Sequence, residues 1–321
     1  MPRRPPNWKT LAAFATVYFV WGSTFLAIRI GVAQVPPFLL AALRFLAAGG
    51  ALVAWRLLRG EKSPAPREWA SATLLAVLIF VLNYGLVFWA ERRVPSGLTA
   101  VMMATIPAFM ALAEILILGT QRLTLRLAAG LAIGVAGVAV LTVRSDSLGG
   151  APVDGAGAVA LIAGAVAWSV ASSLARKLPL PPSRMMSSGA QMLAGGVLLG
   201  VTSMALGEPR AFRPSAVTAE AWLALLYMIV AGSLLAFTAY VWLIHHESPT
   251  KVGTYAYVNP VVAVLLGYAV GGESLGTRAV LATLLILASV LAITTMPPSG
   301  VLPAPVPGLP TRNAGEPGRD R

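Results

Sequence analysis

Ten apolar stretches, each long enough to cross a lipid bilayer as a helix, dominate this sequence. A spanning helix needs about 20 mostly apolar residues, and Gly and Pro within several of the stretches are usual in membrane helices. The pattern predicts an all-α integral membrane protein with ten transmembrane helices. The expected segments are Leu11–Ile28, Pro37–Leu58, Trp69–Ala90, Ser96–Gly119, Leu125–Val143, Val153–Ala175, Arg184–Leu206, Glu220–Leu243, Thr250–Gly271 and Thr277–Met296.

Composition supports this class and excludes several others. Hydrophobic residues make up 57% of the 321 residues and charged residues 11%, against about 25% charged in an ordinary soluble domain. The absence of cysteine excludes disulfides, iron–sulfur clusters, a cysteine nucleophile and thiolate zinc sites. Because His245 and His246 are the whole histidine content, we expect no metal site and no cofactor.

The basic residues indicate how the chain sits in the membrane. The net charge is +12, but the 24 Lys and Arg residues are scattered between apolar blocks and form no clustered nucleic-acid face. If the N-terminus is cytoplasmic, 16 of them flank the spans on the inside and 7 on the outside. The positive-inside rule therefore predicts both termini in the cytoplasm. The preference for Arg over Lys suggests a GC-rich bacterium. Together with the apolar spans, this places the expected protein in a bacterial inner membrane. Arg3-Arg4 then reads as the flank of a retained first helix, not as a cleaved export signal.

The chain also repeats itself at an interval of about 150 residues. Leu46-Ala47-Ala48-Gly49 reappears 147 residues later as Leu193-Ala194-Gly195-Gly196, and Gly119 falls on Gly272 at an offset of 153. We expect two five-helix repeats, residues 11–143 and 153–296, followed by a polar, disordered cytoplasmic tail at residues 297–321. Five is an odd number, so the second repeat must cross the membrane in the opposite sense, as in many secondary transporters.

Several short motifs resemble a known family. In the first half these are Val20-Trp21-Gly22-Ser23-Thr24-Phe25, Ala41-Ala42-Leu43-Arg44-Phe45, Val94-Pro95-Ser96-Gly97 and Ala104-Thr105-Ile106-Pro107. In the second half Gly232-Ser233-Leu234-Leu235-Ala236-Phe237-Thr238-Ala239-Tyr240, Tyr255-Ala256-Tyr257-Val258-Asn259-Pro260 and Gly272-Glu273 are closer still. The chain is similar in these motifs to the EamA family of the drug/metabolite transporter superfamily. The resemblance implies export of amino acids, other metabolites or drugs. The first half departs from the pattern, because Gly119 is followed by Thr120-Gln121 where the family often has glutamate.

Depths estimated from the helical rise of about 1.5 Å per residue place polar and aromatic side chains in two layers. The outer layer holds Trp21, Arg44, Asn83 and Tyr84, and the inner layer holds Trp168, Gln191, Tyr255 and Tyr257, with Asn259 slightly deeper. These nine residues are the candidate substrate-binding set. The aromatic members could stack on an apolar, aromatic or cationic substrate, or they could be ordinary packing and interfacial residues. Pro107 and Pro260 fall near the midplane, where each allows a kink.

Two ionisable residues within the spans have competing interpretations. Arg44 should face the bundle interior because an arginine in lipid costs at least about 2.5 kcal/mol. It is either a cation for a substrate carboxylate or a structural residue that donates to helix carbonyls and Asn83. Glu114, the only acid away from the ends of an expected span, is either a proton-coupling carboxylate or an ion-pair acid at the inner interface with a partner such as Arg56. Apart from Arg126 and Arg278 in their first turns, the fifth and tenth spans lack ionisable residues, so we place them at the periphery.

The sequence is therefore expected to encode a secondary transporter, an exporter of small metabolites such as amino acids, or of drugs, by alternating access. A passive channel or facilitator is the alternative. A polytopic membrane enzyme fits less well, because clustered acids or a His/Asp constellation are missing. No Walker-type loop is present. The expected partners are a small-molecule substrate and the lipid bilayer, with no nucleic acid, and the protein is a monomer or a homodimer.

Overall fold

The computed structural model describes residues 7–119, 124–142, 154–246, 252, 254–274 and 276–294, and every regular element in these ranges is a helix. The expected tail at residues 297–321 lies outside the described residues. The first half contains α1 (Asn7–Val32), α2 (Pro37–Leu58), a third span built of α3 (Pro66–Ala76), η1 (Val77–Gly85) and α4 (Leu86–Ala90), a fourth span built of α5 (Ser96–Met103), α6 (Ile106–Ala113) and η2 (Glu114–Leu118), and α7 (Leu125–Thr142).

The second half follows the same order. It contains α8 (Gly155–Leu174), α9 (Arg184–Ala205), the short α10 (Glu208–Ala211) and η4 (Pro214–Ala216), a span built of α11 (Ala219–Tyr227), η5 (Met228–Leu235) and α12 (Ala236–His246), then α14 (Tyr255–Ala269) and α15 (Thr277–Thr294). The segments η1, η2 and η5 are π-helical.

Seven helices of the described chain are long and apolar enough to cross a membrane. They coincide with the expected first four spans and with the sixth, seventh and eighth. The other three expected spans contain the shorter apolar helices Leu127–Val140, Val258–Ala269 and Thr277–Ala292. The all-α membrane architecture is thus confirmed, whereas the number of ten spans stays a prediction.

Glycines that end helices or precede the next one occur in matched pairs. Gly60 and Gly207 have φ of +82° and +72°, and they stand 147 residues apart. Gly119 and Gly272 both have φ of +65° and stand 153 residues apart. Only glycine adopts this left-handed conformation at little cost. Both intervals equal offsets found in the sequence repeat. The chain therefore turns between helices at equivalent positions of the two halves.

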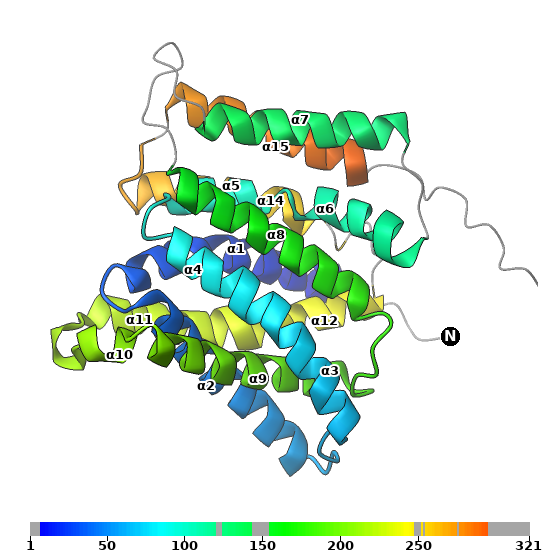
Figure 1. Ribbon diagram of the computed structural model, residues 1–321, viewed down its shortest axis with the longest axis vertical. Coiled ribbons are helices and arrows are strands. Elements are labelled where there is room, and N and C mark those ends of the chain that lie inside the picture. Colours follow the sequence, from blue (N-terminus) through cyan, green and yellow to red (C-terminus); the bar gives the residue numbers. More distant parts are fainter. Residues whose placement is uncertain are drawn as a thin grey trace, which may run out of the picture.

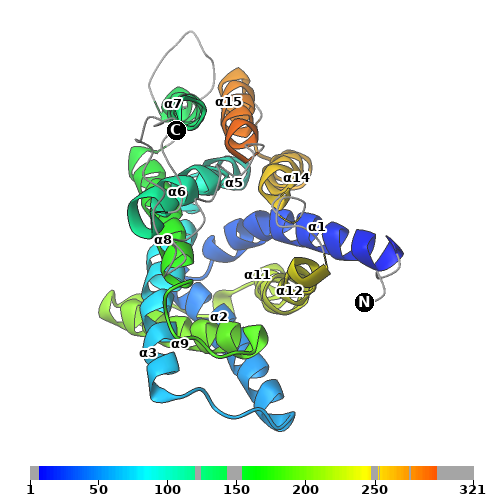
Figure 2. The ribbon, with the colours of Figure 1, turned by 90° about the vertical axis from the view of Figure 1, so that its right-hand side faces the viewer.

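The two halves also exchange packing partners. The first helix of each half packs on the third span of the other, α1 on α12 and α8 on η1. Each also packs on the fourth span of the other half, α1 on α14 and α8 on α6, while α2 pairs with α9 and α7 with α15. Figures 1 and 2 show α7 and α15 side by side at one end of the molecule, where α15 also contacts α5, α6 and α14. This reciprocal exchange is what a two-fold relation between repeats produces.

The contact between α2 and α9 is made by the repeated glycine motif itself. A Cβ at Gly49 would stand 2.4 Å from the backbone nitrogen of Leu193, and one at Gly196 would stand 2.6 Å from that of Leu46. Small residues of this kind allow two membrane helices to approach closely. The motif that revealed the repeat therefore also forms its central helix pair.

Acidic residues after α2 and α9 bind the start of the opposite helix. Glu208 accepts hydrogen bonds from the backbone N–H groups of Phe38, at 3.3 Å, and Leu39, at 2.8 Å. Glu61, 147 residues earlier, bonds to Ser183 at the N-cap of α9 and accepts from Nε of Arg56 at 2.6 Å. The first N–H groups of a helix have no helical partner, so Glu208 satisfies two such donors directly, whereas Glu61 binds the side chain of the N-cap serine. The Arg56 hydrogen bond lowers the pKa of Glu61.

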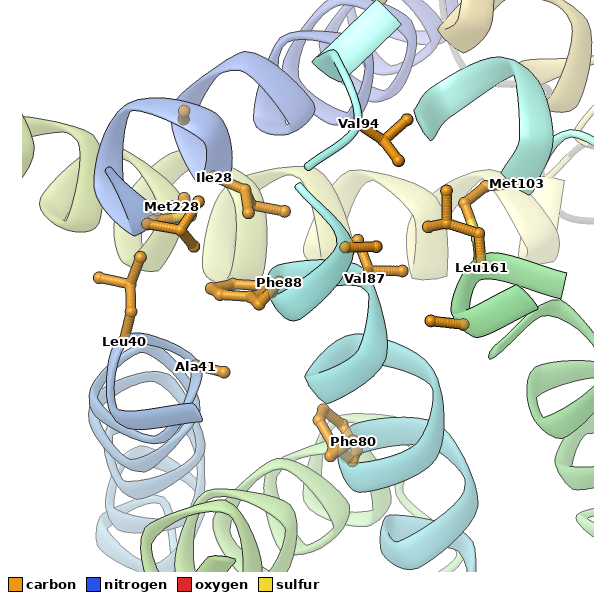
Figure 3. Packing of buried hydrophobic residues seen from close by; sticks show 14 of the residues in the cluster. Ile28, Leu40, Ala41, Phe80, Val87, Phe88, Val94, Met103, Leu161 and Met228 are labelled. Atoms are coloured by element: carbon orange, nitrogen blue, oxygen red, sulfur yellow. The ribbon is translucent and has the colours of Figure 1, made fainter. Parts of the chain in front are cut away.

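A hydrophobic cluster joins the two halves around the third span. Figure 3 shows Phe88 of α4 facing Ile28 of α1 and Met228 of η5, with Val87 directed toward Leu161 of α8. These side chains are almost completely buried, and Met228 begins the π-helical segment η5.

Candidate functional site

A cavity of about 300 Å³ lies at the centre of the helical bundle. Its walls come from the first four spans of both halves, and among the described residues none from α7 or α15 lines it. The cavity brings together most of the side chains singled out from the sequence. They are Trp21, Arg44, Asn83, Tyr84, Pro107, Trp168, Gln191, Tyr255, Asn259 and Pro260. The backbone of Tyr257 belongs to α14, but its side chain lies outside the described residues.

Arg44 supplies the positive charge of this cavity. Its side chain leaves α2, is 97% buried (relative exposure 3%), and donates from Nε to Oγ of Ser233 on η5 at 2.9 Å. The guanidinium lies 4.9 Å from the ring centre of Phe45 and 5.5 Å from that of Tyr84. Its Nη1 is buried without a hydrogen-bond partner. No Asp, Glu or Lys is found among the described residues that line the cavity.

Asn83 does not bind Arg44, contrary to one of the two interpretations of that arginine. Its amide donates to the carbonyl of Gly164 on α8 at 3.0 Å and so joins η1 to the second half. Gln191 donates to Oγ of Ser187, one turn earlier on α9, at 3.0 Å. Ser233, the actual partner of Arg44, was not selected from the sequence, although it stands in the Gly232-Ser233 motif that carries part of the family resemblance.

The aromatic side chains pair across the two halves and do not form the two expected layers. Trp21 lies 5.2 Å from Tyr240 and 5.3 Å from Tyr255, between ring centres, and donates to the carbonyl of Gly232 at 3.1 Å. Trp168 instead contacts Tyr84 of the first half, at 6.0 Å. The helical rise gives the depth of a backbone position only, and α1 runs from Asn7 to Val32 instead of the expected Leu11–Ile28, with Trp21 near its middle.

The two prolines act differently on their helices. Pro107 stands in the first turn of α6, immediately after a break at Ala104 and Thr105. Pro260 lies inside α14, which continues through it. Because proline has no N–H, the carbonyls four residues earlier, at Met103 and Ala256, lose their helical donor. Both of those residues line the cavity, so each proline leaves a backbone acceptor close to it.

Glu114 lies away from the cavity and forms an ion pair. Its Oε1 is 3.0 Å from Nη2 of Arg176, in the segment that follows α8. The expected partner Arg56 binds Glu61 instead. The correction has a simple reason: the helical rise fixes depth along a span, but it does not say which neighbour faces a given side of the helix.

A fully buried acid was not identified from the sequence because it directly follows a span and was assigned to a loop. Glu91, directly after the third span, is fully buried, and neither carboxylate oxygen has a hydrogen-bond partner. Burial raises the pKa of Glu91 well above its ordinary value, the nearby Glu273 raises it further, and Arg29 opposes the rise. Glu273 itself accepts from the backbone N–H groups of Ser96 and Gly97 at the start of α5, at 2.6 Å and 3.0 Å. The glutamate present only in the second half therefore binds a helix start in the first.

Comparisons with known proteins agree with this architecture. The model of the EamA-like transporter family matches residues 8–143 and 155–295. The uncharacterized inner membrane transporter YedA of Escherichia coli K12 is 40% identical over 284 residues, which cover 88% of this chain and 89% of YedA. Protein PecM of Dickeya dadantii is 29% identical over 251 residues, 78% of this chain and 80% of PecM.

One crystal structure superposes with a TM-score of 0.59 at 23% identity and covers 90% of this chain and 98% of that one, which shows a shared fold. The family model spans both halves, and the similarity to YedA extends over most of both proteins. With its all-helical membrane architecture and its central cavity, this chain belongs to the EamA-like transporter family, whose role is membrane transport.

Proposed function

We propose that this protein is a secondary transporter that exports small metabolites, such as amino-acid-like compounds, or drugs by alternating access. The observation that carries the proposal is the central cavity, whose walls come from the first four spans of both repeats. Two repeats of opposite orientation can exchange conformations, so that a site between them opens to each side of the membrane in turn.

The remaining parts of the proposal concern topology and the site. We place the protein in a bacterial inner membrane with ten spans, two inverted repeats and both termini in the cytoplasm, from the Lys and Arg count. The cavity residues Trp21, Arg44, Asn83, Trp168 and Asn259, with their cavity neighbours Tyr84, Gln191 and Tyr255 and with Tyr257, would contact the transported molecule. The break before Pro107 and the missing helical hydrogen bond at Pro260 would let the fourth and ninth spans bend.

Counterflow in proteoliposomes tests this function. The purified protein is reconstituted with a mixture of unlabelled amino acids inside, and the uptake of each labelled amino acid is followed with and without a pH gradient. An alternating-access transporter is expected to show transient uptake above equilibrium, because each inward passage is coupled to an outward passage of the internal substrate. Uptake that only equilibrates, at a rate independent of internal substrate, would indicate a channel and contradict the proposal.

A further inference from the structure

The central cavity contains a buried positive charge that no described side chain in its walls neutralises. A guanidinium presents five N–H donors; in Arg44, Nε donates to Oγ of Ser233, whereas Nη1 is buried without a hydrogen-bond partner. Arg44 is absent from the ion pairs of the described residues, which are Arg56–Glu61, Arg93–Asp154 and Arg176–Glu114. A buried charge without a counter-ion is costly, and removing that cost favours whatever anion enters the site.

The remaining lining residues determine which size and polarity the uncharged part of such an anion can have. Phe45 and Tyr84 flank the guanidinium, and most other lining residues are apolar or aromatic. The volume of about 300 Å³ is at the lower end of the range for small-molecule pockets. A compound with one ring or a short aliphatic chain fits these dimensions, with its charged end at Arg44 and its apolar end against the aromatic side chains.

The same walls offer little to a cation. The described lining residues contain no carboxylate. The rings of Trp21, Tyr240 and Tyr255 pack against one another, with centres 5.2 to 5.9 Å apart. Arg44 would also repel a positive charge in an interior where electrostatic interactions are weakly screened.

We propose that the cavity binds small organic anions, namely monocarboxylates with an apolar or aromatic body, with Arg44 as the carboxylate-binding residue and Ser233 as the residue that positions it. The inference rests on the proposed function, since it names the substrate class of the same cavity, and within the small metabolites proposed there it favours carboxylates without an ammonium group over amino acids. Charge-assisted hydrogen bonds from Arg44 would discriminate a carboxylate from its neutral analogue by about tenfold or more.

Three ligands with the same carbon skeleton test the inference on the purified wild-type protein. They are 3-phenylpropanoate, 3-phenylpropan-1-ol and 3-phenylpropan-1-amine, and their affinities are measured from the rise in unfolding temperature with ligand concentration. The carboxylate is expected to bind at least about tenfold more tightly than the alcohol, and the amine more weakly than either. Equal affinities, preference for the amine, or no binding of the carboxylate would overturn the inference.

Variants test whether Arg44 causes the preference for the carboxylate over the alcohol. Arg44→Gln is expected to bind the carboxylate and the alcohol equally, and Arg44→Lys to keep part of the preference, because the charge stays but the planar fork is lost. Arg59→Gln, at an exposed arginine outside the cavity, is the matched control and should resemble the wild type. An unchanged preference in Arg44→Gln would contradict the role of Arg44. If Arg44→Gln does not fold, the comparison of the three ligands on wild-type protein still decides the substrate class.

The experiments distinguish failure of the proposed substrate class from failure of the proposed transport function. Failure of 3-phenylpropanoate to bind, together with amino-acid counterflow in proteoliposomes, would leave the transporter standing and overturn only the substrate class. Binding of the carboxylate without counterflow of any labelled 3-phenylpropanoate would support the anion site and contradict alternating access.

Discussion

At the scale of single residues, the ionisable groups in the interior have different environments and hence different roles. Arg44 faces the cavity with a free donor, Glu114 pairs with Arg176, and Glu91 is buried with neither oxygen bonded. The sequence identified Arg44 and Glu114 because they interrupt apolar stretches. It could not identify Glu91, since burial of a residue next to a span depends on the helices that pack over it.

The pH dependence of stability should report the burial of Glu91. Its folded-state pKa is raised above the ordinary value of 4.5, so the folded protein binds a proton more tightly than the unfolded chain. Stability is therefore expected to fall as pH rises from 4.5 toward the raised pKa, by up to about 1.4 kcal/mol per pH unit. Glu91→Gln should remove this fall and unfold at a higher temperature than the wild type near pH 7. Unfolding temperatures between pH 4.5 and about 8 in detergent measure the effect.

The control for that experiment is Glu220→Gln, at an exposed acid near the start of α11. It should leave the pH profile of the wild type unchanged. Parallel profiles for Glu91→Gln and the wild type over the whole range would show that Glu91 has no raised pKa.

The variant Glu114→Gln tests whether Glu114 carries the proton in proton-coupled transport. Because Arg176 is 57% exposed at its side chain, the pair should contribute at most about 1 kcal/mol. Glu114→Gln is therefore expected to retain both substrate exchange and gradient-driven transport in proteoliposomes, with an unchanged pH dependence. Loss of gradient-driven transport with exchange intact would instead assign the proton to Glu114.

At the scale of elements, the helices near the cavity depart from regular α-helical geometry at equivalent places. The π-helical segments η1 and η5 begin 151 residues apart, at Val77 and Met228. The first provides Asn83 and Tyr84 to the cavity, and the second provides Gly232 and Ser233. Such π-helical turns often occur at functional sites. The apolar pattern predicted both spans, but an extra residue in a turn leaves no mark in hydropathy.

The helix pair α2 and α9 gives a sharp test at this scale. Gly49→Ala is expected to destabilise the protein by about 1–3 kcal/mol, because its Cβ would meet the backbone of Leu193 in an interior with no room to spare. Gly50→Ala is the matched control, since a Cβ there meets nothing within 4 Å and alanine favours a helix by about 1 kcal/mol over glycine. Unfolding temperatures in detergent compare the two variants. Equal stability of both would contradict the close helix contact.

At the scale of the whole molecule, sequence reasoning succeeded where the signal is long and periodic. The apolar stretches predicted the helices, and the recurring motifs at Leu46 and Leu193 predicted a repeat that the exchanged packing partners reproduce. The sequence did not allow the contacts between distant segments to be predicted. The bonds of Arg44 to Ser233, Asn83 to Gly164 and Glu114 to Arg176 depend on which face each helix turns to its neighbours.

The orientation in the membrane is tested by single cysteines, which the absence of native cysteine makes unambiguous. A cysteine placed between Gly207 and Ala219 is expected to react in intact cells with an impermeant thiol reagent. Cysteines between Arg59 and Arg67, or in the tail after Met296, should react only after the cells are opened. Labelling of the tail in intact cells would reverse the topology.

The central claim is that the cavity between the repeats is the route through the membrane, and access to one cavity position tests it most directly. Met103 lines the cavity on α5, whereas Leu82, 41% exposed on η1, does not. A Met103→Cys protein is predicted to react with an impermeant thiol reagent both in intact cells and in inverted membrane vesicles, while Leu82→Cys reacts in neither. Reaction of Met103→Cys from one side only, or from neither, would contradict the account.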